Sequence, residues 1–248
     1  MSDIQKWGTW ELEDVKAEAA SAKGGDKAAF MNFQQGRNVI RFLPPLVGQK
    51  HPFFRYKQHY LNNGEKKVSF RCPRDVNKFC PACAHADKLR RTGNPADFKT
   101  AGDYFAKARI LAHVINRAQP ELGVQIVGFG KSVYGQLLDL RSDQDTGVDY
   151  IHPITGNDVI VVKEGAGFKT EYKVKLMPAA SQLGNLDWID QQVDLSRFAK
   201  VLEADEIEAF INNEEGGVID VSPKKQLTSA APRKTSSVAD EFDADLPF

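Results

Sequence analysis

Three cysteines lie within twelve residues of one another, at Cys72, Cys80 and Cys83. An odd number of thiols so close together is a poor disulfide framework, and in a reducing compartment such a cluster more often binds a metal ion. The last two form the knuckle Cys80-Pro81-Ala82-Cys83, whose thiolates can face one ion. Zinc takes four ligands in a tetrahedron and prefers cysteine and histidine. The sequence therefore predicts one zinc ion that needs a fourth ligand.

Three histidines are candidates for that fourth ligand. His59 is the first choice, because it lies thirteen residues before Cys72 on a predicted hairpin strand that can present it across the loop. His85 follows the knuckle and is the alternative, and His51 is farther away. Four protein ligands leave no position for water, so the site is expected to be structural rather than catalytic. The competing interpretations are three free cysteines or a redox pair, although no thioredoxin-like βαβ unit surrounds the knuckle.

Aromatic and basic side chains alternate in several segments. Single-stranded nucleic acid needs this combination, since cations contact phosphates and exposed rings stack on unpaired bases. If residues 53–60 form a strand, Arg55 and Lys57 share one face of it. Residues 104–109 repeat the pattern, and turns at 128–131 and 167–172 place rings beside glycines and bases. The competing interpretation is that each ring is a core residue. The candidate DNA contacts from these segments are Arg55, Lys57, Tyr104, Phe105, Lys107, Arg109, Phe129, Lys131, Phe168 and Tyr172.

The elements that must position these residues are mostly short strands. Strands are expected at 38–43, 53–61, 67–71, 104–116, 124–129, 159–162 and 172–176, with a tight turn at Asn62-Asn63-Gly64. Helical spacing is present at 81–91, 131–140 and 195–211. The turn residues Thr92-Gly93-Asn94-Pro95 are expected to end the first of these helices. The predicted fold class is mainly β with added helices (α+β). Among such folds, the OB barrel commonly binds single strands, so we expect an OB barrel with a zinc-binding subdomain inserted around residues 59–91.

Charge is distributed unevenly over a chain of zero net charge. Residues 40–175 carry 22 Lys and Arg against 13 Asp and Glu, whereas residues 238–248 carry four acids and no bases. This favours a body that binds a polyanion and a separate tail. The predicted organisation is an arm at 1–35, a DNA-binding core at 36–221, and a linker with an acidic tail at 222–248. Because neither a membrane helix nor a secretory signal is evident, a cytoplasmic protein is expected.

The last residues combine acids with an apolar end. Solubility would explain Asp243 and Asp245, but not the Leu246-Pro247-Phe248 that follows them. A terminal phenylalanine with its carboxylate suits an apolar pocket rimmed by bases, so these five residues are predicted to bind a partner protein. A flexible polyanion of this kind can also compete with DNA for a basic groove.

Two resemblances follow from these motifs. The tip resembles the acidic tail of bacterial single-stranded-DNA-binding proteins, which ends in Ile-Pro-Phe and recruits replication and repair enzymes. Residues 36–176 resemble the single-stranded-DNA-binding, helix-destabilising proteins of T-even-like bacteriophages. The motifs that carry this second resemblance are Val39-Ile40-Arg41-Phe42-Leu43-Pro44, His59-x12-Cys72, Cys80-Pro81-x-Cys83, Tyr104-Phe105-Ala106, Gly128-x-Gly130-Lys131 and residues 152–172.

The phage resemblance implies an OB fold with a zinc subdomain, and it supports His59 as the fourth ligand. It also implies DNA contacts from positions such as Tyr104, Lys131 and Phe168, and its first motif adds Arg41. Two departures stand out. Seven residues separate Cys72 from Cys80, which is fewer than the resemblance leads us to expect. The arm also lacks the Lys-Arg-Lys-Ser-Thr type of motif that the family uses for cooperative filament growth, so growth through such a motif is not expected.

The predicted function is that of a non-enzymatic protein that coats and protects single-stranded DNA in phage replication, recombination and repair. Its tip would recruit partners such as a helicase, primase, polymerase or recombinase, and it would act in the cytoplasm of the infected host cell. Two alternatives remain open. One is a zinc-dependent protein-interaction adaptor without DNA activity, and the other is a nuclease or primase accessory. An enzyme of the latter class needs a carboxylate cluster for magnesium, whereas the acids here are scattered.

Overall fold

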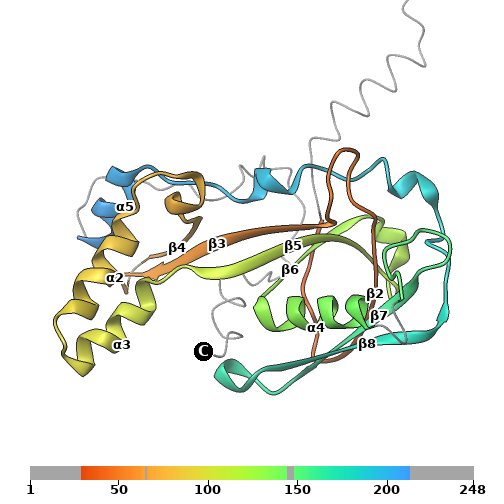
Figure 1. Cartoon of the computed structure of the whole chain (residues 1–248), viewed down its shortest axis with the longest axis horizontal. Helices are drawn as coiled ribbons and strands as arrows, with labels where there is room; N and C mark the ends of the chain where they lie inside the picture. Colours follow the sequence, from red (N-terminus) through yellow and green to blue (C-terminus); the bar gives the residue numbers. More distant parts are fainter. Residues whose placement is uncertain (1–28, 65, 144–147, 213–248) are drawn as a thin grey trace, which may run out of the picture.

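The computed structural model describes residues 29–64, 66–143 and 148–212 (Figure 1). Most of the predicted arm and the whole acidic tip, including Asp243, Asp245 and Leu246-Pro247-Phe248, lie outside these residues. The described chain combines an eight-stranded sheet with four α-helices and short 3-10 turns, which confirms the α+β class. None of the helices in these three ranges is long and apolar enough to cross a membrane.

Strand pairing follows the order β1-β6-β5-β2-β7-β8, and β3 pairs with both β4 and β5. The long strand β5 therefore joins two regions: its second half pairs with β2, and its first half pairs with β3. The hydrogen-bonded sheet is not closed into a barrel. The strands are β1 Ala29–Met31, β2 Gly36–Phe42, β3 Phe53–Asn62, β4 Lys67–Arg71, β5 Lys107–Asn116, β6 Gln125–Phe129, β7 Asn157–Glu164 and β8 Glu171–Ala180.

One apolar core lies inside the curve of this sheet. Alternate side chains of β2, β5, β6, β7 and β8 point into it, as the period of two along a strand requires. Helix α4 (Lys131–Ser142) contributes Val133 and Leu137 to the same core (Figure 1). Met31 and Phe33 also lie in it, so the end of the segment predicted as an arm belongs to the sheet.

Two helices occupy the ranges that the sequence predicts, and a third was not predicted. Helix α2 runs over Pro81–Arg91 and α4 begins at Lys131. Helix α3 (Pro95–Tyr104) takes residues expected to form a turn and the start of a strand. The cause is Asn94, whose side chain accepts a hydrogen bond from the Ala96 amide at 3.0 Å and so begins a new helix where a break was expected.

The helix predicted over residues 195–211 is wrong as a single element. A 3-10 turn at Leu195–Phe198 is followed by extended chain and then by α5 (Ala204–Ile211). The Lys200 carbonyl accepts a hydrogen bond from the Arg71 amide at 2.7 Å, which draws this stretch along β4. A capping box between Glu203 and Glu206 then starts α5.

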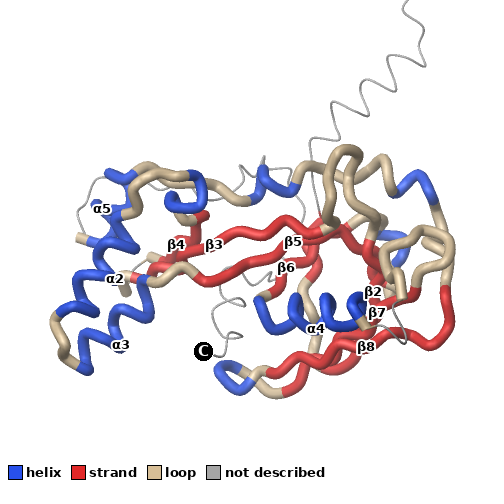
Figure 2. Tube along the Cα trace, viewed as in Figure 1, coloured by secondary structure: helices blue, strands red, loops and turns tan. Residues whose placement is uncertain are grey.

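Residues 183–203, called the strap here, run along the outer side of the sheet (Figure 2). Leu183 packs on Leu43 and Ile115, and Leu195 packs against the β3 and β5 side chains of a second cluster. The Val193 amide donates to Nε2 of buried His113 at 3.3 Å. Burial lowers the pKa of His113 to about 4, so its ring stays neutral and can accept this bond at neutral pH. The strap thereby ties the main sheet to the β3–β4 hairpin.

A buried cation fixes the turn before β7. The guanidinium of Arg41 is fully buried, donates to the His152 carbonyl and lies 3.8 Å from Asp158. Arg117 also donates to Asp158, at 3.0 Å. Burial lowers the pKa of Arg41, because its charge has left water. Gly156 lies directly against this group.

We predict that Gly156→Ala destabilises the fold. A methyl group there would lie 2.5 Å from the Asp149 carbonyl oxygen and 2.6 Å from that of His152, where backbone must shift to admit it. The free energy of unfolding, measured by urea denaturation, should fall by about 1–3 kcal/mol. Gly135→Ala is the control, since nothing lies within 4 Å of that helical position, and it should raise stability by about 0.5–1 kcal/mol. Equal stability of the two variants would contradict the assigned packing.

Candidate metal centre and nucleic-acid interface

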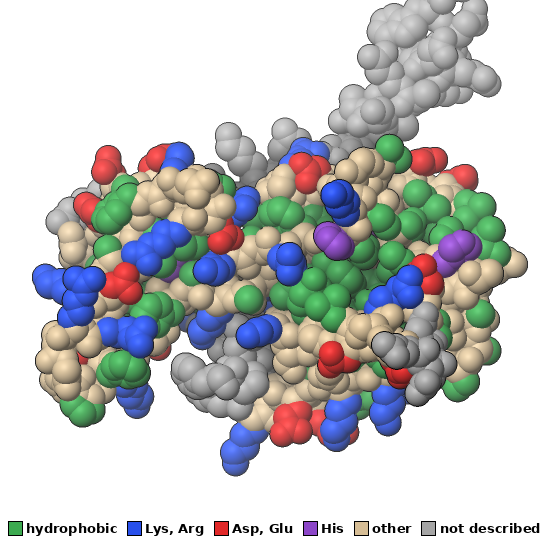
Figure 3. All heavy atoms as spheres, in the orientation of Figure 1, with side chains coloured by type: hydrophobic (Ala, Val, Ile, Leu, Met, Phe, Trp, Pro, Cys, Tyr) green, Lys and Arg blue, Asp and Glu red, His purple; other side chains and the backbone are tan. Residues whose placement is uncertain are grey.

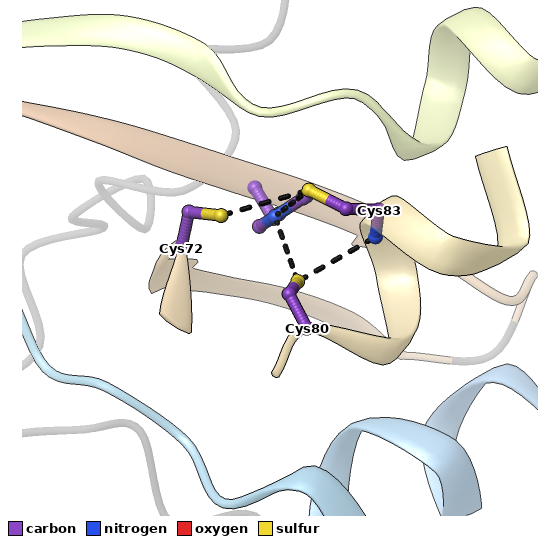
Figure 4. Close-up of side chains that lie close together, drawn as sticks. Cys72, Cys80 and Cys83 are labelled. Carbon is purple, nitrogen blue, oxygen red and sulfur yellow. Dashed lines mark hydrogen bonds between the residues drawn. The ribbon is translucent and has the colours of Figure 1, made fainter. Parts of the chain in front are cut away.

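The four predicted zinc ligands converge in space. His59, Cys72, Cys80 and Cys83 are all buried, and their ligand atoms lie within 4.8 Å of one another. Nε2 of His59 is 3.3 Å from the Cys80 sulfur and 3.6 Å from the Cys83 sulfur, and the Cys72 and Cys83 sulfurs are 3.6 Å apart. Figure 4 shows the three sulfurs directed toward a common centre. The group can hold a metal ion.

Three separate elements deliver these side chains. His59 stands on β3, Cys72 follows the end of β4, and Cys80 is the N-cap of α2. Pro81 at the first helical position suits this start, because proline supplies a helical φ and lacks only an amide that would have no partner there. The Cys83 amide points back at the Cys80 sulfur at 3.5 Å. The knuckle is thus the first turn of a helix.

The orientation of His59 is set by a backbone group. Its Nδ1 lies 2.8 Å from the Tyr104 carbonyl oxygen at the end of α3. A carbonyl only accepts, so Nδ1 carries the proton and Nε2 keeps a free lone pair toward the sulfurs. His85 lies elsewhere, with its ring centroid 4.5 Å from that of Tyr104. The structure therefore groups His59, and not His85, with the three cysteines.

The protein groups alone do not favour three thiolates at this place. Burial raises the pKa of Cys72, and hydrogen bonding to Cys80 raises that of Cys83. Hydrogen bonding by Cys83 lowers the pKa of Cys80 to about 4. One negative charge is thus favoured over three, because like charges in an apolar surrounding repel one another. A divalent cation would compensate the additional thiolates.

The metal cluster is joined to β3 through the backbone of Lys57. The Cys72 amide donates to the Lys57 carbonyl at 2.8 Å, and the Lys57 amide donates to the Asp75 carboxylate at 2.7 Å. Asp75 lies in the loop that starts at Cys72. The backbone amide and carbonyl of Lys57 are therefore both held by the loop that carries a candidate metal ligand. Sequence reasoning did not find Asp75, because no short-range pattern connects it with Lys57.

The predicted DNA contacts on β3 lie on an open face. Arg55 and Lys57 are exposed, and neither forms an ion pair with a described residue. They share the strand face of His59, so they stand between the metal cluster and α4. Lys131, at the start of α4, is also exposed. In Figure 3, Lys and Arg side chains gather on this side of the molecule over the middle of β3 and β5, next to an apolar area.

The predicted contacts on β5 belong to the opposite face. Register pairs Gln58 with Lys107 and Tyr56 with Arg109, and directly opposed residues share a face. Lys107 and Arg109 therefore point with Tyr56 toward the strap. Arg109 is buried, and its guanidinium lies so close to Gly128 that a methyl group there would be 2.4 Å from it. The two ring-and-base segments do not make one surface.

Several other predicted contacts are core or partly buried residues. Phe129 is 3% exposed and its ring packs edge-on against Phe42, so its aromatic signal reflects the core. Arg41 is fully buried beside Asp158 and offers no cation at the surface. Tyr172 packs on Phe33 at the margin of the core. Burial thus gives no support to DNA contact by Phe129 or Arg41.

The remaining predicted aromatic residues are Tyr104, Phe105 and Phe168. Tyr104 is half-buried on His85, and Phe105 is covered by the guanidinium of Arg90 at 5.4 Å. Phe168 belongs to the 3-10 turn Gly167–Lys169 between β7 and β8. One ring was missed: Tyr134 of α4 faces Arg55, whose guanidinium carbon lies 5.6 Å from the ring centroid. A helix carrying one tyrosine gives no pattern that would have marked it.

Comparison with known proteins places the chain in a family. Residues 34–214 match the family model described as gp32 DNA binding protein like. The chain belongs to the gp32-like DNA-binding family. It is 26% identical to the single-stranded DNA-binding protein of Enterobacteria phage T4, covering 94% of this chain and 83% of that protein. The corresponding protein of Enterobacteria phage T2 is also 26% identical, with coverages of 95% and 86%. The resemblance to T-even phage proteins is confirmed.

The grouping of ligands in this gp32-like chain predicts a defined effect of histidine substitution. Wild-type protein should carry about one divalent metal ion per chain, as four ligands imply. His59→Ala should lose most of that metal and unfold at a lower temperature, because it removes one of the four ligands. Elemental analysis and thermal unfolding measure both effects. His85→Ala is the matched control and should keep its metal. Full occupancy in His59→Ala would exclude it as a ligand.

Proposed function

We propose that this protein binds single-stranded DNA along the face of β3 that carries Arg55 and Lys57. The observation that carries the proposal is the position of these exposed cations, between the buried cysteine cluster and α4, in a chain of the gp32-like family. Cations without acidic partners are available to phosphates, whereas paired ones are not. The names of the phage T4 and T2 relatives specify single-stranded DNA, which favours a single strand over a duplex as ligand.

Zinc is the metal that best suits the cluster. A tetrahedral zinc ion with sulfur ligands at about 2.3 Å and nitrogen at about 2.0 Å requires ligand atoms about 3.5–3.8 Å apart. The closest ligand pairs lie 3.3–3.6 Å apart, which is compatible with one such ion. When bound, zinc would neutralise the thiolates and brace the hairpin. With four protein ligands it would serve structure, and we propose no catalytic role for it.

The curved sheet is proposed to be an OB-type barrel. Support comes from the single core that β2 and β8 share with α4, and from the ring contact of Phe33 with Tyr172, which joins the chain after β1 to β8. Side chains thus bridge strands that the backbone pairing leaves apart. The β3–β4 hairpin with α2 and α3 would be the inserted metal-binding subdomain, next to the DNA-binding face.

Function beyond binding is proposed from the sequence and the family. The protein would coat and protect single strands during phage replication, recombination and repair, without catalysing a reaction, in the cytoplasm of an infected cell. Its acidic tip, Asp243, Asp245 and Leu246-Pro247-Phe248, would recruit replication and recombination proteins. An apolar terminal side chain with a free carboxylate and nearby acids suits a basic-rimmed pocket on such a partner.

Binding is tested by fluorescence polarisation of labelled oligo-dT and of a matched duplex at two salt concentrations. We expect tight binding to the single strand only. The logarithm of the association constant should fall against that of salt with a slope of roughly −0.7 for each phosphate neutralised. Equal affinity for duplex, or binding that salt does not weaken, would reject the proposed function. No binding to either oligonucleotide would instead favour a protein-interaction adaptor.

The tail is tested by removing residues 240–248. We expect tighter binding to oligo-dT at low salt, because a polyanion that competes for the cationic face is lost. Capture of replication proteins by the immobilised chain should be lost as well. A variant in which Asp243 and Asp245 become Asn but Leu246-Pro247-Phe248 remains separates charge from the apolar end. Unchanged partner capture after truncation would refute the tail assignment.

A further inference from the structure

The cationic face ends at an aromatic ring that the sequence did not single out. Tyr134 stands on α4 and packs edge-on against Phe53, with ring centroids 5.4 Å apart at 80°. Phe53 in turn packs edge-on against Phe42 and Phe129 of the main core. Tyr134 is only half-buried, so part of the residue reaches the surface. The ring is therefore held by core residues in a residue that is open to solvent on one side.

Two exposed cations flank this ring. The guanidinium carbon of Arg55 lies 5.6 Å from its centroid, within the range of a cation–π contact. Such a contact provides no hydrogen-bond acceptor, so the guanidinium N–H groups can still donate to a phosphate. Lys131 stands three residues before Tyr134 on α4, which puts both on one side of the helix. Neither cation forms an ion pair within the described chain.

We propose that Tyr134, Arg55 and Lys131 form one nucleotide subsite. An unpaired base would stack on the Tyr134 ring, and the adjoining phosphates would be held by Arg55 and Lys131. Stacking on a ring needs no base-specific hydrogen bond, so the subsite would accept any base. This inference rests on the proposed function, and it names the residues at the α4 end of the DNA path.

The subsite is placed on the same strand as the metal cluster. Arg55 precedes His59 by four residues of β3, a distance of about 13 Å along an extended strand. Lys57 lies between them on the same face, held by Cys72 and Asp75. A strand of DNA that follows this face would meet Lys57 and then the Tyr134 subsite. The hairpin that holds the metal thus also sets the spacing of the two contacts.

The test separates base stacking from charge by changing the protein and the oligonucleotide together. Binding is measured on oligo-dT and on the same length with abasic sites in place of its central bases. Tyr134→Leu should weaken binding to oligo-dT roughly tenfold, in line with loss of a stacked base. It should have little effect on the abasic oligonucleotide and should leave the salt slope unchanged. Tyr134→Phe keeps the ring and should bind as the wild type does.

Arg55→Gln tests the phosphate contact at an exposed position that the fold does not need. It should weaken binding to both oligonucleotides and reduce the salt slope by about 0.7, as loss of one phosphate contact to a single strand predicts. Lys78→Gln is the matched control, because Lys78 is already paired with Glu203 at 3.0 Å beside α5. Its salt slope should equal that of the wild type. Thermal unfolding of each variant checks the fold.

The outcomes distinguish this subsite from the function on which it rests. If wild-type protein binds oligo-dT but folded Tyr134→Leu loses the same affinity on abasic as on intact DNA, stacking at Tyr134 is overturned and the proposed function stands. If Tyr134→Leu does not fold, photo-cross-linking of wild-type protein to an iodouracil-substituted strand decides. Adducts on the peptide that contains Tyr134 support the subsite, and adducts confined to other peptides overturn it. Failure of the wild type to bind overturns the proposed function itself.

Discussion

The hold on the backbone of β3 is the constraint on which the rest of the interface depends. The side chain of His59 on this strand lies among three buried sulfurs. Two residues earlier, the backbone amide and carbonyl of Lys57 are both bound by the loop that begins at Cys72. The outer half of this strand pairs only with β4, so it has less support than strands in the middle of the sheet. Because it is clamped at one end by the metal ligands and at the other by the Phe53 contacts, its middle has one orientation. The exposed cations stand on that middle.

The region around the candidate metal ligands does not form a complete core by itself. Leu202, Ile207 and Phe210 pack in the same cluster as the three cysteines, although they arrive some 120 positions later in the chain. Eleven-residue α2 and its short neighbours bury little apolar surface of their own, and a metal ion bound by the cluster would add stability there. The end of the strap and α5 supply the remaining apolar contacts, and the strap connects this region to the main sheet. Loss of a bound metal ion should therefore destabilise the sheet as a whole, because the metal ligands and the Phe53 contacts hold the same strand, β3.

Local patterns in the sequence predicted the elements well and their relation poorly. The ranges of α2 and the start of α4 followed from helical spacing, and the metal ligands followed from the knuckle and one hairpin histidine. The break within residues 195–211 was invisible, because its cause is a bond between Lys200 and Arg71 on a distant strand. Asn94 was taken as the end of a helix, since the same residue type that stops one helix can begin the next. Tyr134 lay in a helix whose periodicity marks its apolar side and says nothing about which ring meets a cation.

The ring-and-base motifs illustrate this limit most clearly. Segments 53–60 and 104–109 both combine aromatic with basic residues, yet the register of β3 with β5 puts Arg55 opposite Ile110 and Arg109 opposite Tyr56. Shifting that pairing by one residue would exchange the faces and bring both sets of cations together. Packing on the strap side opposes the shift, because it would remove either Tyr56 or Leu111 from the cluster that both form there. Packing on the strap side thus decides which cations reach the open side, so the proposed DNA-binding face is a consequence of the core behind it.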